Sequence, residues 1–188
     1  KVIVAIHGWQ GDKTSMYPVM KLMKIENANW FLLDAPYLVE NGKGKSWSYQ
    51  HKNGVWEVDK PKELLNNFFK QLFNQYDSKK IYVLGFSQGG MICLDFVLYL
   101  DKVLGAVFPI CGFLRQPKLD VQRFHPCQID TPILIGHGKD DDIVPSESSQ
   151  LAHELLYKQG ANVELLLYNG KHKIGLDYVK KMVKIINK

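Results

Sequence analysis

Short runs of apolar residues alternate along this chain with stretches in which apolar residues recur every three or four positions. A run that is apolar throughout is typical of a strand buried on both faces, as in a parallel sheet. On this basis we predict strands at Val2–Ile6, Trp30–Leu33, Ile81–Leu84, Leu104–Ile110, Pro132–Ile135 and Val163–Tyr168.

The intervening stretches have the spacing of amphipathic helices. One runs from Pro61, a residue suited to a first helical turn, to Tyr76. Others are expected from about Ser146 to Gly160 and from Ile174 to Ile186. This alternation predicts an α/β fold with a mostly parallel, doubly wound sheet flanked by helices. Residues 34–59 and 112–131 are the two long stretches that we predict to be irregular. We expect a single domain over residues 1–188 and no large lid domain, because residues 112–131 are too few to form one.

Composition narrows the possible partners and settings. The net charge is +5, but the lysines are scattered, so we expect a solvated surface and no nucleic-acid binding. No apolar run approaches the roughly 18 residues of a membrane span, so we expect no stable membrane insertion. The cysteines are Cys93, Cys111 and Cys127, an odd number whose spacing fits no metal motif. We therefore predict a reducing, cytoplasmic setting without a metal or cofactor.

The segment Gly85-Phe86-Ser87-Gln88-Gly89 has the pattern G-x-S-x-G between a predicted strand and a helix that opens at Gly90. A sharp strand-to-helix turn lifts the serine hydroxyl clear of the sheet and needs small residues on either side. The helix N-terminus behind the turn favours developing negative charge. Ser87 is therefore the candidate nucleophile, against the alternative of an ordinary glycine-rich turn.

A serine hydroxyl needs a histidine base, and the histidine needs a carboxylate. Where G-x-S-x-G occurs in this context, the acid and then the base follow the serine along the chain. The acidic run after the fifth strand fits H-G-x-x-D-x-x-V-P, which selects Asp141, while Asp140 and Asp142 could cap the next helix or bind a cation. His172 lies in the loop after the last strand and is the candidate base, whereas His153 lies within a helix.

The first strand runs into His7-Gly8-Trp9. In α/β-hydrolases a loop at this place supplies one backbone N–H to the oxyanion, and the residue after the nucleophile supplies the other. Here these donors would be Trp9 and Gln88. A simple turn is the alternative, and we expect His7 itself to be structural.

Together these motifs resemble the phospholipase/carboxylesterase family of α/β-hydrolases, which includes the acyl-protein thioesterases. The nucleophile motif agrees letter for letter through Gly90, and Ala35-Pro36 and Ser46-Trp47 resemble family segments beside the acyl pocket. The resemblance implies that the predicted strands are the fold's later, parallel ones, its initial antiparallel strands being absent or upstream. Serine hydrolases that share G-F-S-Q-G are the nearest alternative family.

Two segments depart from the family pattern. The family reads H-G-L-G-D, whereas His7 to Asp12 is one residue longer, and Ser46-Trp47-Ser48-Tyr49 lacks the usual Phe-Asp. Both departures affect the pocket, so they bear on which substrate is preferred and not on the chemistry. The candidate pocket residues are Trp47, Trp56, Phe113 and Leu114, each of which could equally pack in the core.

We therefore predict a serine carboxylesterase or thioesterase that hydrolyses small or medium acyl esters through an acyl-enzyme, with an open cleft and a small-molecule substrate. A peptidase of the same fold is one alternative, because a triad alone does not distinguish ester from amide substrates. A non-catalytic binding protein is the other, and the intact set of Ser87, Asp141 and His172 argues against it.

Overall fold

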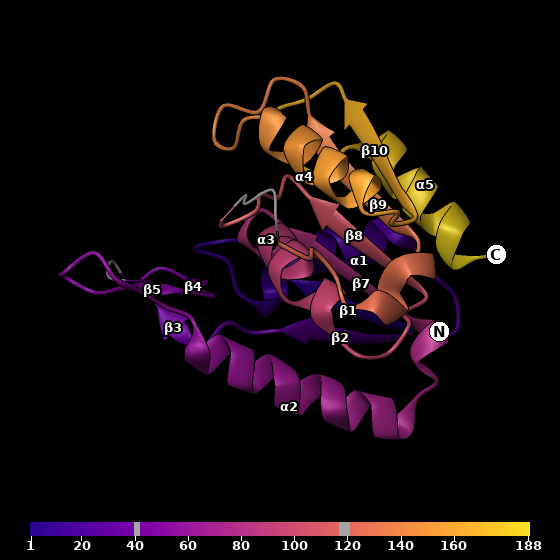
Figure 1. Ribbon diagram of the computed structural model, residues 1–188, viewed down its shortest axis with the longest axis horizontal. Helices are drawn as coiled ribbons and strands as arrows, with labels where there is room; N and C mark the ends of the chain where they lie inside the picture. The colour runs from indigo at the N-terminus through magenta and orange to yellow at the C-terminus, as the bar shows by residue number, and fades with distance from the viewer. Residues whose placement is uncertain (40–41, 117–120) are drawn as a thin grey trace.

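The computed structural model describes residues 1–39, 42–116 and 121–188. Both long stretches predicted to be irregular, 34–59 and 112–131, include residues outside these ranges. Strands and helices alternate along the chain, as Figure 1 shows. The strands are β1 (Val2–Ile6), β2 (Asn29–Leu33), β3 (Tyr37–Leu38), β4 (Lys45–Ser46), β5 (Tyr49–Gln50), β6 (Trp56–Glu57), β7 (Ile81–Phe86), β8 (Ala106–Ile110), β9 (Ile133–Gly138) and β10 (Val163–Tyr168).

The α-helices are α1 (Tyr17–Met23), α2 (Asp59–Gln75), α3 (Gln88–Asp95), α4 (Glu147–Lys158) and α5 (Leu176–Ile186). Short 3-10 helices connect some of them: η1 (Lys13–Met16), η2 (Ser78–Lys80), η3 (Val97–Tyr99) and η4 (Pro126–Asp130). Among the described residues, no helix combines the length and the apolar character needed to cross a bilayer.

The central sheet has six parallel strands in the order β10-β9-β8-β7-β1-β2. The chain first adds β2 on one side of β1 and then places β7 on the other side. In open α/β sheets such a reversal of strand order opens a crevice at the carboxyl ends of the strands. The loops after β1 and β7 therefore meet at this crevice.

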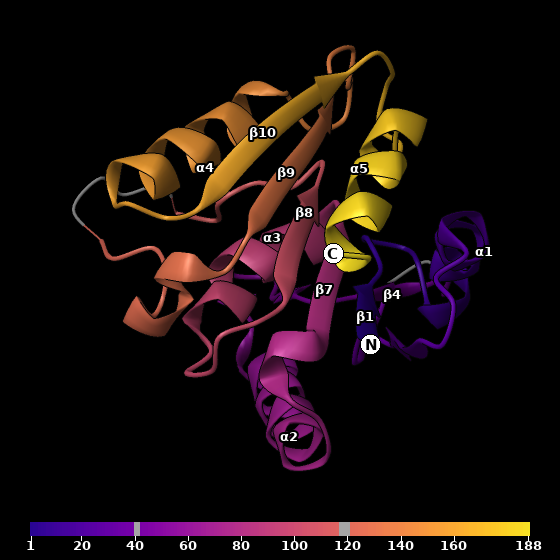
Figure 2. The same cartoon turned by 90° about the vertical axis from the view of Figure 1, so that its right-hand side faces the viewer.

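Helices cover both faces of the sheet, which explains why the inner strands β1 and β8 are apolar and buried along their whole length, whereas the edge strand β10 carries the exposed Glu164. Val2, Val4 and Ile6 pack in one cluster with residues of α2, α3 and α4. Ile3 and Ala5 pack in the other cluster with residues of α1 and α5. Figure 2 shows α5 and α1 on the side of the sheet opposite α3 and α4. The predicted α/β fold with flanking helices is confirmed, and the described residues form no large lid domain.

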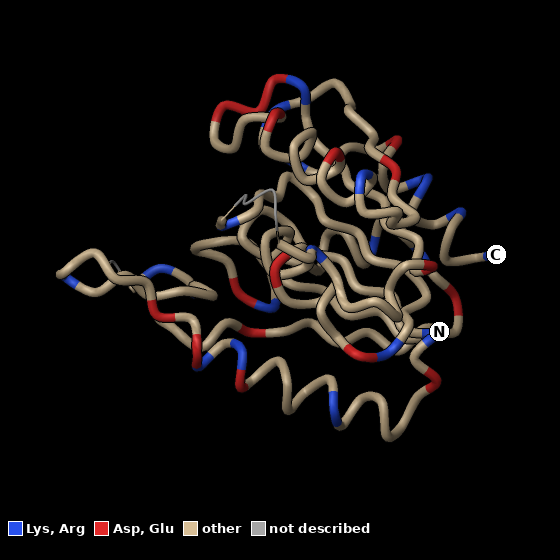
Figure 3. Tube along the Cα trace, viewed as in Figure 1, with Lys and Arg blue, Asp and Glu red and all other residues tan. Residues whose placement is uncertain are grey.

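Some element boundaries differ from the prediction. The fifth strand was expected to end at Ile135, but β9 continues to Gly138 because His137 and Gly138 pair with the end of β10. The stretch 34–59 was expected to be irregular, yet it contains two short antiparallel ladders, β3 with β4 and β5 with β6. Basic and acidic residues are interspersed along the described trace in Figure 3.

Candidate active site

Ser87 occupies a strained turn between β7 and α3. Its backbone angles are φ 55° and ψ −113°, and a positive φ is unusual for a residue with a side chain. The neighbouring glycines allow the turn to be tight, since a Cβ at Gly85 would lie 2.1 Å from the carbonyl oxygen of Gly89. A Cβ at Gly89 would lie 2.2 Å from the carbonyl oxygen of Ile6. The two glycines thus hold Ser87 at the carboxyl ends of β7 and β1.

Asp141 and His172 are in direct contact. Nδ1 of His172 lies 2.7 Å from Oδ2 of Asp141, and a carboxylate oxygen can only accept, so Nδ1 carries the proton and donates it. The other carboxylate oxygen accepts from the backbone N–H groups of Ile143 and Val144, at 3.0 and 2.9 Å. Burial alone would raise the pKa of Asp141, but the hydrogen bonds from His172, Val144 and Ile143 lower it below its usual value. The carboxylate is therefore ionised at neutral pH.

The loops that carry these two residues touch through a glycine. A Cβ at Gly138, the last residue of β9, would lie 2.3 Å from the carbonyl oxygen of Lys171. The His172 ring also packs against Phe86, the residue before Ser87, with ring centroids 4.8 Å apart. His172 thus lies between the acid loop and the serine turn, although no hydrogen bond joins it to Ser87 within the described residues.

The competing acids and the competing base lie elsewhere. Asp142 is exposed and pairs with Lys171, with 3.0 Å between Oδ2 and Nζ. Asp140 is also exposed. His153 lies in α4, where its ring stacks on Tyr157. Of these residues, the structure brings together Asp141 and His172.

Cys111, His137 and Asp141 have potential metal-ligand atoms within 4.8 Å of one another. The atoms that could bind a metal are already engaged in hydrogen bonds within the protein. The ring nitrogens of His137 lie 2.6 Å from the Ser149 hydroxyl and 2.8 Å from the Val144 carbonyl oxygen. Burial raises the pKa of the Cys111 thiol to about 11 and keeps it protonated. This group therefore fits a packed hydrogen-bonded cluster better than a metal site.

Trp9 and Gln88 are the candidate oxyanion donors. Gln88 is the first residue of α3, where backbone N–H groups lack partners within the helix. Among the described residues, no hydrogen bond is formed by the backbone N–H of either Trp9 or Gln88. The Trp9 loop adjoins the candidate nucleophile, because a Cβ at the preceding Gly8 would lie 3.2 Å from Cβ of Ser87. Two backbone amides that lack a hydrogen-bond partner among the described residues therefore belong to segments next to Ser87.

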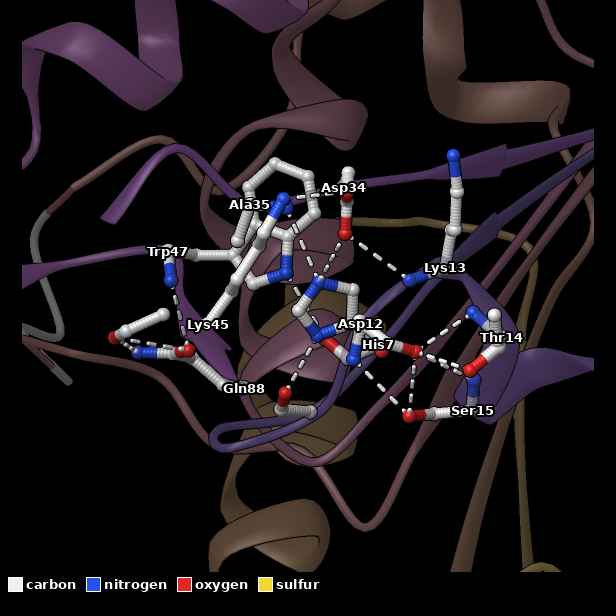
Figure 4. A network of polar contacts seen from close by, with 12 residues as sticks. His7, Asp12, Lys13, Thr14, Ser15, Asp34, Ala35, Lys45, Trp47 and Gln88 are labelled. Atoms are coloured by element: carbon white, nitrogen blue, oxygen red, sulfur yellow. Dashed lines mark hydrogen bonds and ion pairs between the residues drawn. The ribbon is translucent and has the colours of Figure 1, made fainter. Parts of the chain in front are cut away.

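The buried His7 anchors the loop that follows β1, and Figure 4 shows it among its contacts with Ala35 and Trp47. The backbone N–H of Ala35 donates to Nε2 of His7 at 3.1 Å, so the proton of the neutral ring is on Nδ1, which donates to the Gly8 carbonyl oxygen at 2.7 Å. Burial lowers the pKa of His7 and favours this neutral form. His7 therefore ties the candidate oxyanion loop to the segment after β2.

The side chain of Gln88 fixes the other donor. Its Oε1 accepts from the backbone N–H of Trp47 at 2.9 Å, and its Nε2 donates to the hydroxyls of Ser46 and Ser48 at 3.1 and 2.9 Å. The Trp47 indole N–H in turn donates to the carbonyl oxygen of His7 at 3.0 Å. Figure 4 shows that this network links the segments of both candidate oxyanion donors.

A cavity of about 480 Å³ borders Ser87, and we call it the Ser87 cavity. Trp56 and Phe113, two of the candidate pocket residues, line it. The other two lie elsewhere: Trp47 is fully buried in the core and borders a separate cavity beside α2 and α3, and Leu114 packs in the same core cluster. The Ser87 cavity is lined by Trp9, Val39, Ser46, Ser48, Tyr49, Gln50, Trp56, Ser87, Gln88, Phe113, Ile143 and Val144.

The roles of several supporting residues were not predicted from the sequence. Ser46 and Ser48 lie in a segment noted for its resemblance to a family motif, but no role was predicted for their hydroxyls, which hold Gln88. Phe86 was seen only as the variable position of the nucleophile motif, but it supports the His172 ring. The polar serines around a buried tryptophan were the available signal for the first contact. No signal in the sequence indicates the second contact, between Phe86 and His172.

Comparison with known proteins places these features in a family. The sequence model described as Phospholipase/Carboxylesterase matches residues 1–188. The chain is 33% identical to acyl-protein thioesterase 1 of Debaryomyces hansenii over 189 residues, covering 89% of this chain and 82% of that protein. It is 26% identical to carboxylesterase SOBER1 of Arabidopsis thaliana over 204 residues, covering 97% of this chain and 89% of that protein.

Solved structures have the same fold. The crystal structure of Arabidopsis thaliana SOBER1 matches with a TM-score of 0.84 and 24% identity, covering 100% of this chain and 97% of that chain. The crystal structure of esterase PE8 matches with a TM-score of 0.83 and 23% identity, covering 100% and 91%.

Proposed function

The chain belongs to the phospholipase/carboxylesterase family of ester hydrolases, and on this premise we propose that Ser87, His172 and Asp141 form its catalytic triad. The observation that carries the proposal is the hydrogen bond between His172 and Asp141 beside the strained turn of Ser87. With Nδ1 of His172 donating to Asp141, the lone pair of Nε2 is available to accept a proton.

The reaction begins when Ser87 Oγ attacks the acyl carbonyl carbon while Nε2 of His172 takes the hydroxyl proton. The carbonyl oxygen becomes an oxyanion, which accepts hydrogen bonds from the amides of Trp9 and Gln88. Asp141 stabilises the imidazolium that forms. When the tetrahedral intermediate collapses, the imidazolium protonates the leaving alcohol or thiol, and a water molecule later releases the acid by the same steps.

The network around His7 and Gln88 supports this assignment of the oxyanion site. A donor is effective only if it points to the oxyanion before the charge develops. The contacts of His7 with Ala35 and of Gln88 with Trp47 hold both backbone segments in place. Loss of one such donor costs about 10²–10³ in rate in well-studied hydrolases.

The Ser87 cavity suits the acyl group. Ser87, Gln88 and Trp9 all border it, so a carbonyl carbon on Ser87 Oγ would carry its acyl chain into this space. Phe113, Trp56 and Ile143 supply apolar walls. A cavity of about 480 Å³ accommodates a small or medium acyl chain. We propose the substrate to be an acyl ester or thioester of that size.

A fluorophosphonate probe tests the proposal directly. The wild-type protein should be labelled at Ser87, as located by peptide mapping, and Ser87→Ala should not be labelled. A panel of p-nitrophenyl esters and thioesters should be hydrolysed much faster than a panel of peptide anilides. Labelling of another residue, or faster cleavage of the anilides, would contradict the assignment.

The two candidate histidines offer a matched control. His172→Ala should lose ester hydrolysis, because no other described base lies beside Ser87. His153→Ala should keep wild-type activity, because His153 stacks on Tyr157 in α4. The reverse result would refute the role of the loop after β10.

A further inference from the structure

A second cavity, of about 490 Å³, borders His172 on the side of α1. We call it the His172 cavity. Trp9 lines both this cavity and the Ser87 cavity and therefore stands between them. The His172 cavity is lined by Gly8, Trp9, Gln10, Gly11, Ser15, Met16, Pro18, Val19, Leu22, Phe86, His172, Lys173 and Ile174.

The walls of the His172 cavity are largely apolar. Met16 and Val19 are buried beneath it, and Leu22, on α1, is 47% exposed. Ile174 closes the side that follows His172 in sequence. Apart from His172 itself, the only ionisable side chain in this described lining is Lys173. The proposed mechanism uses His172 and the backbone amide of Trp9, but it gives the apolar walls of this cavity no role.

We propose that the His172 cavity binds the leaving group of the substrate, and that this group is a neutral, apolar alcohol or thiol. The inference rests on the proposed triad. Because Nδ1 of His172 is committed to Asp141, the proton for the leaving atom comes from Nε2. The leaving atom must therefore lie within reach of the His172 ring, and its substituent must occupy space beside that ring.

The two cavities then divide the substrate at its reacting bond. In the tetrahedral intermediate the carbonyl carbon is bonded to Ser87 Oγ, the oxyanion, the acyl chain and the leaving oxygen or sulfur. The bond from carbon to the leaving atom breaks, its electron pair stays on that atom, and the Nε2 proton of His172 neutralises it. The acyl chain stays in the Ser87 cavity as the acyl-enzyme, while the alcohol or thiol departs through the His172 cavity.

The lining also indicates the chemical class of the leaving group. A cationic alcohol such as choline would find no described carboxylate in these walls and would meet Lys173 and, during the reaction, the His172 imidazolium. An alkyl or aromatic group would instead bury apolar surface against Met16 and Val19. Such burial contributes up to about fourfold in kcat/KM per added methylene.

Two ester series test the assignment separately. One varies the alcohol in acetates from methyl to octyl, and the other varies the acyl chain in ethyl esters over the same lengths. Wild-type kcat/KM should rise along the acetate series and fall sharply when the neutral alkyl alcohol is replaced by choline. A flat acetate series, or preference for choline, would overturn the proposal.

Leu22→Trp narrows the His172 cavity at an exposed position that tolerates a larger side chain. It should flatten the dependence of kcat/KM on alcohol length and leave the slope of the acyl series unchanged. Ile129→Trp is the matched control, because Ile129 is 45% exposed and lies in η4, which precedes β9 and so is at the amino ends of the strands. A change confined to the acyl series in Leu22→Trp would mean that the two cavities are assigned the wrong way round.

Reaction of the acyl-enzyme with added alcohols tests the leaving-group site separately from the acyl site. With p-nitrophenyl acetate as the acyl donor, hexanol should compete with water and form hexyl acetate more efficiently than ethanol does, and Leu22→Trp should abolish this advantage. If the protein hydrolyses no ester and reacts with no fluorophosphonate, the proposed function itself fails. If it does both but shows no preference among alcohols, only the leaving-group assignment is wrong.

Discussion

His137 lies 3.1 Å, through its Nε2 atom, from the same Asp141 oxygen that accepts the hydrogen bond of His172. Both side chains of this second pair are fully buried. The atoms around Nε2 of His137 are the Asp141 carboxylate and the Val144 carbonyl oxygen, which can only accept, so this nitrogen carries a proton. The proposed catalytic acid is therefore held by two histidines and two backbone amides.

From this contact we predict that His137 is a positioning residue, which holds Asp141 in place. His137→Ala should lower kcat for p-nitrophenyl acetate by about tenfold or more, because a misplaced Asp141 no longer fixes the His172 ring. KM should change little, since neither cavity beside the triad is lined by His137. His137→Asn, which can still donate a hydrogen bond, should recover part of kcat. An unchanged kcat in a folded His137→Ala protein would show that the contact has no role in catalysis.

The choice among the three consecutive acids gives a second prediction. Asp141→Asn should reduce kcat by about 10⁴-fold, because the amide favours the wrong tautomer of His172. Asp140→Asn and Asp142→Asn should cost far less, since both side chains are exposed. The three variants are compared in one ester assay. High activity of Asp141→Asn beside an inactive neighbour would mean that a different carboxylate acts.

The strained backbone of Ser87 predicts that substitutions there abolish activity without lowering stability. Ser87→Ala should lose about 10³-fold or more in ester hydrolysis and keep nearly the wild-type melting temperature, because alanine retains the Cβ and the strained φ. Ser87→Gly should also be inactive but more stable than Ser87→Ala by about 1 kcal/mol, because glycine relieves strain of about 1–3 kcal/mol and loses part of that gain to its freer unfolded chain. Calorimetry of the two variants measures the difference.

Acidification should destabilise the fold through His7. Burial lowers the pKa of His7 below its reference value of 6.5, so the unfolded chain binds a proton more readily than the folded one. The free energy of unfolding therefore falls as the pH drops through about 6.5 towards the lowered pKa of the folded state. The slope between pH 7.5 and 5.5 should be smaller in His7→Gln than in the wild type. An equal slope in both proteins would exclude His7 as its source, and His153→Gln serves as the control.

Hydrolysis should survive removal of divalent ions. In the cluster of Cys111, His137 and Asp141, the atoms that could bind a metal already form hydrogen bonds within the protein. Dialysis against EDTA should therefore leave kcat and KM unchanged. Loss of activity that zinc or another divalent ion restores would instead make this cluster a metal site.

The parallel sheet was predictable because its inner strands are apolar on both faces, and the candidate serine, acid and histidine were predicted from their order in the turns after the strands. Helix α1 was not predicted, because seven residues span too few turns for a clear periodicity. Two signals lay close to its start: the capping box of Asp12 with Ser15 begins the preceding 3-10 helix η1, and Pro18 lies in the first turn of α1. The His172 cavity was missed for the same reason, since α1 forms one of its walls.

The pocket residues were harder to predict than the candidate triad. A tryptophan in a loop suits a pocket wall or the core equally well, and the difference depends on partners distant in sequence. Trp47 is drawn into the core because its indole N–H reaches the His7 carbonyl oxygen and its backbone holds Gln88. The indole of Trp56 forms no hydrogen bond within the described residues, and Trp56 is 53% exposed and lines the Ser87 cavity.

The position of Trp9 between the two cavities makes it a built-in optical reporter. Its indole is 59% exposed, so its fluorescence emission should respond to a ligand that displaces water on either side. Of the chain's four tryptophans, Trp9 and Trp56 border the Ser87 cavity, whereas Trp9 alone borders the His172 cavity. In a Trp56→Phe background, spectral changes would then report occupancy at the junction of the two cavities without any added dye.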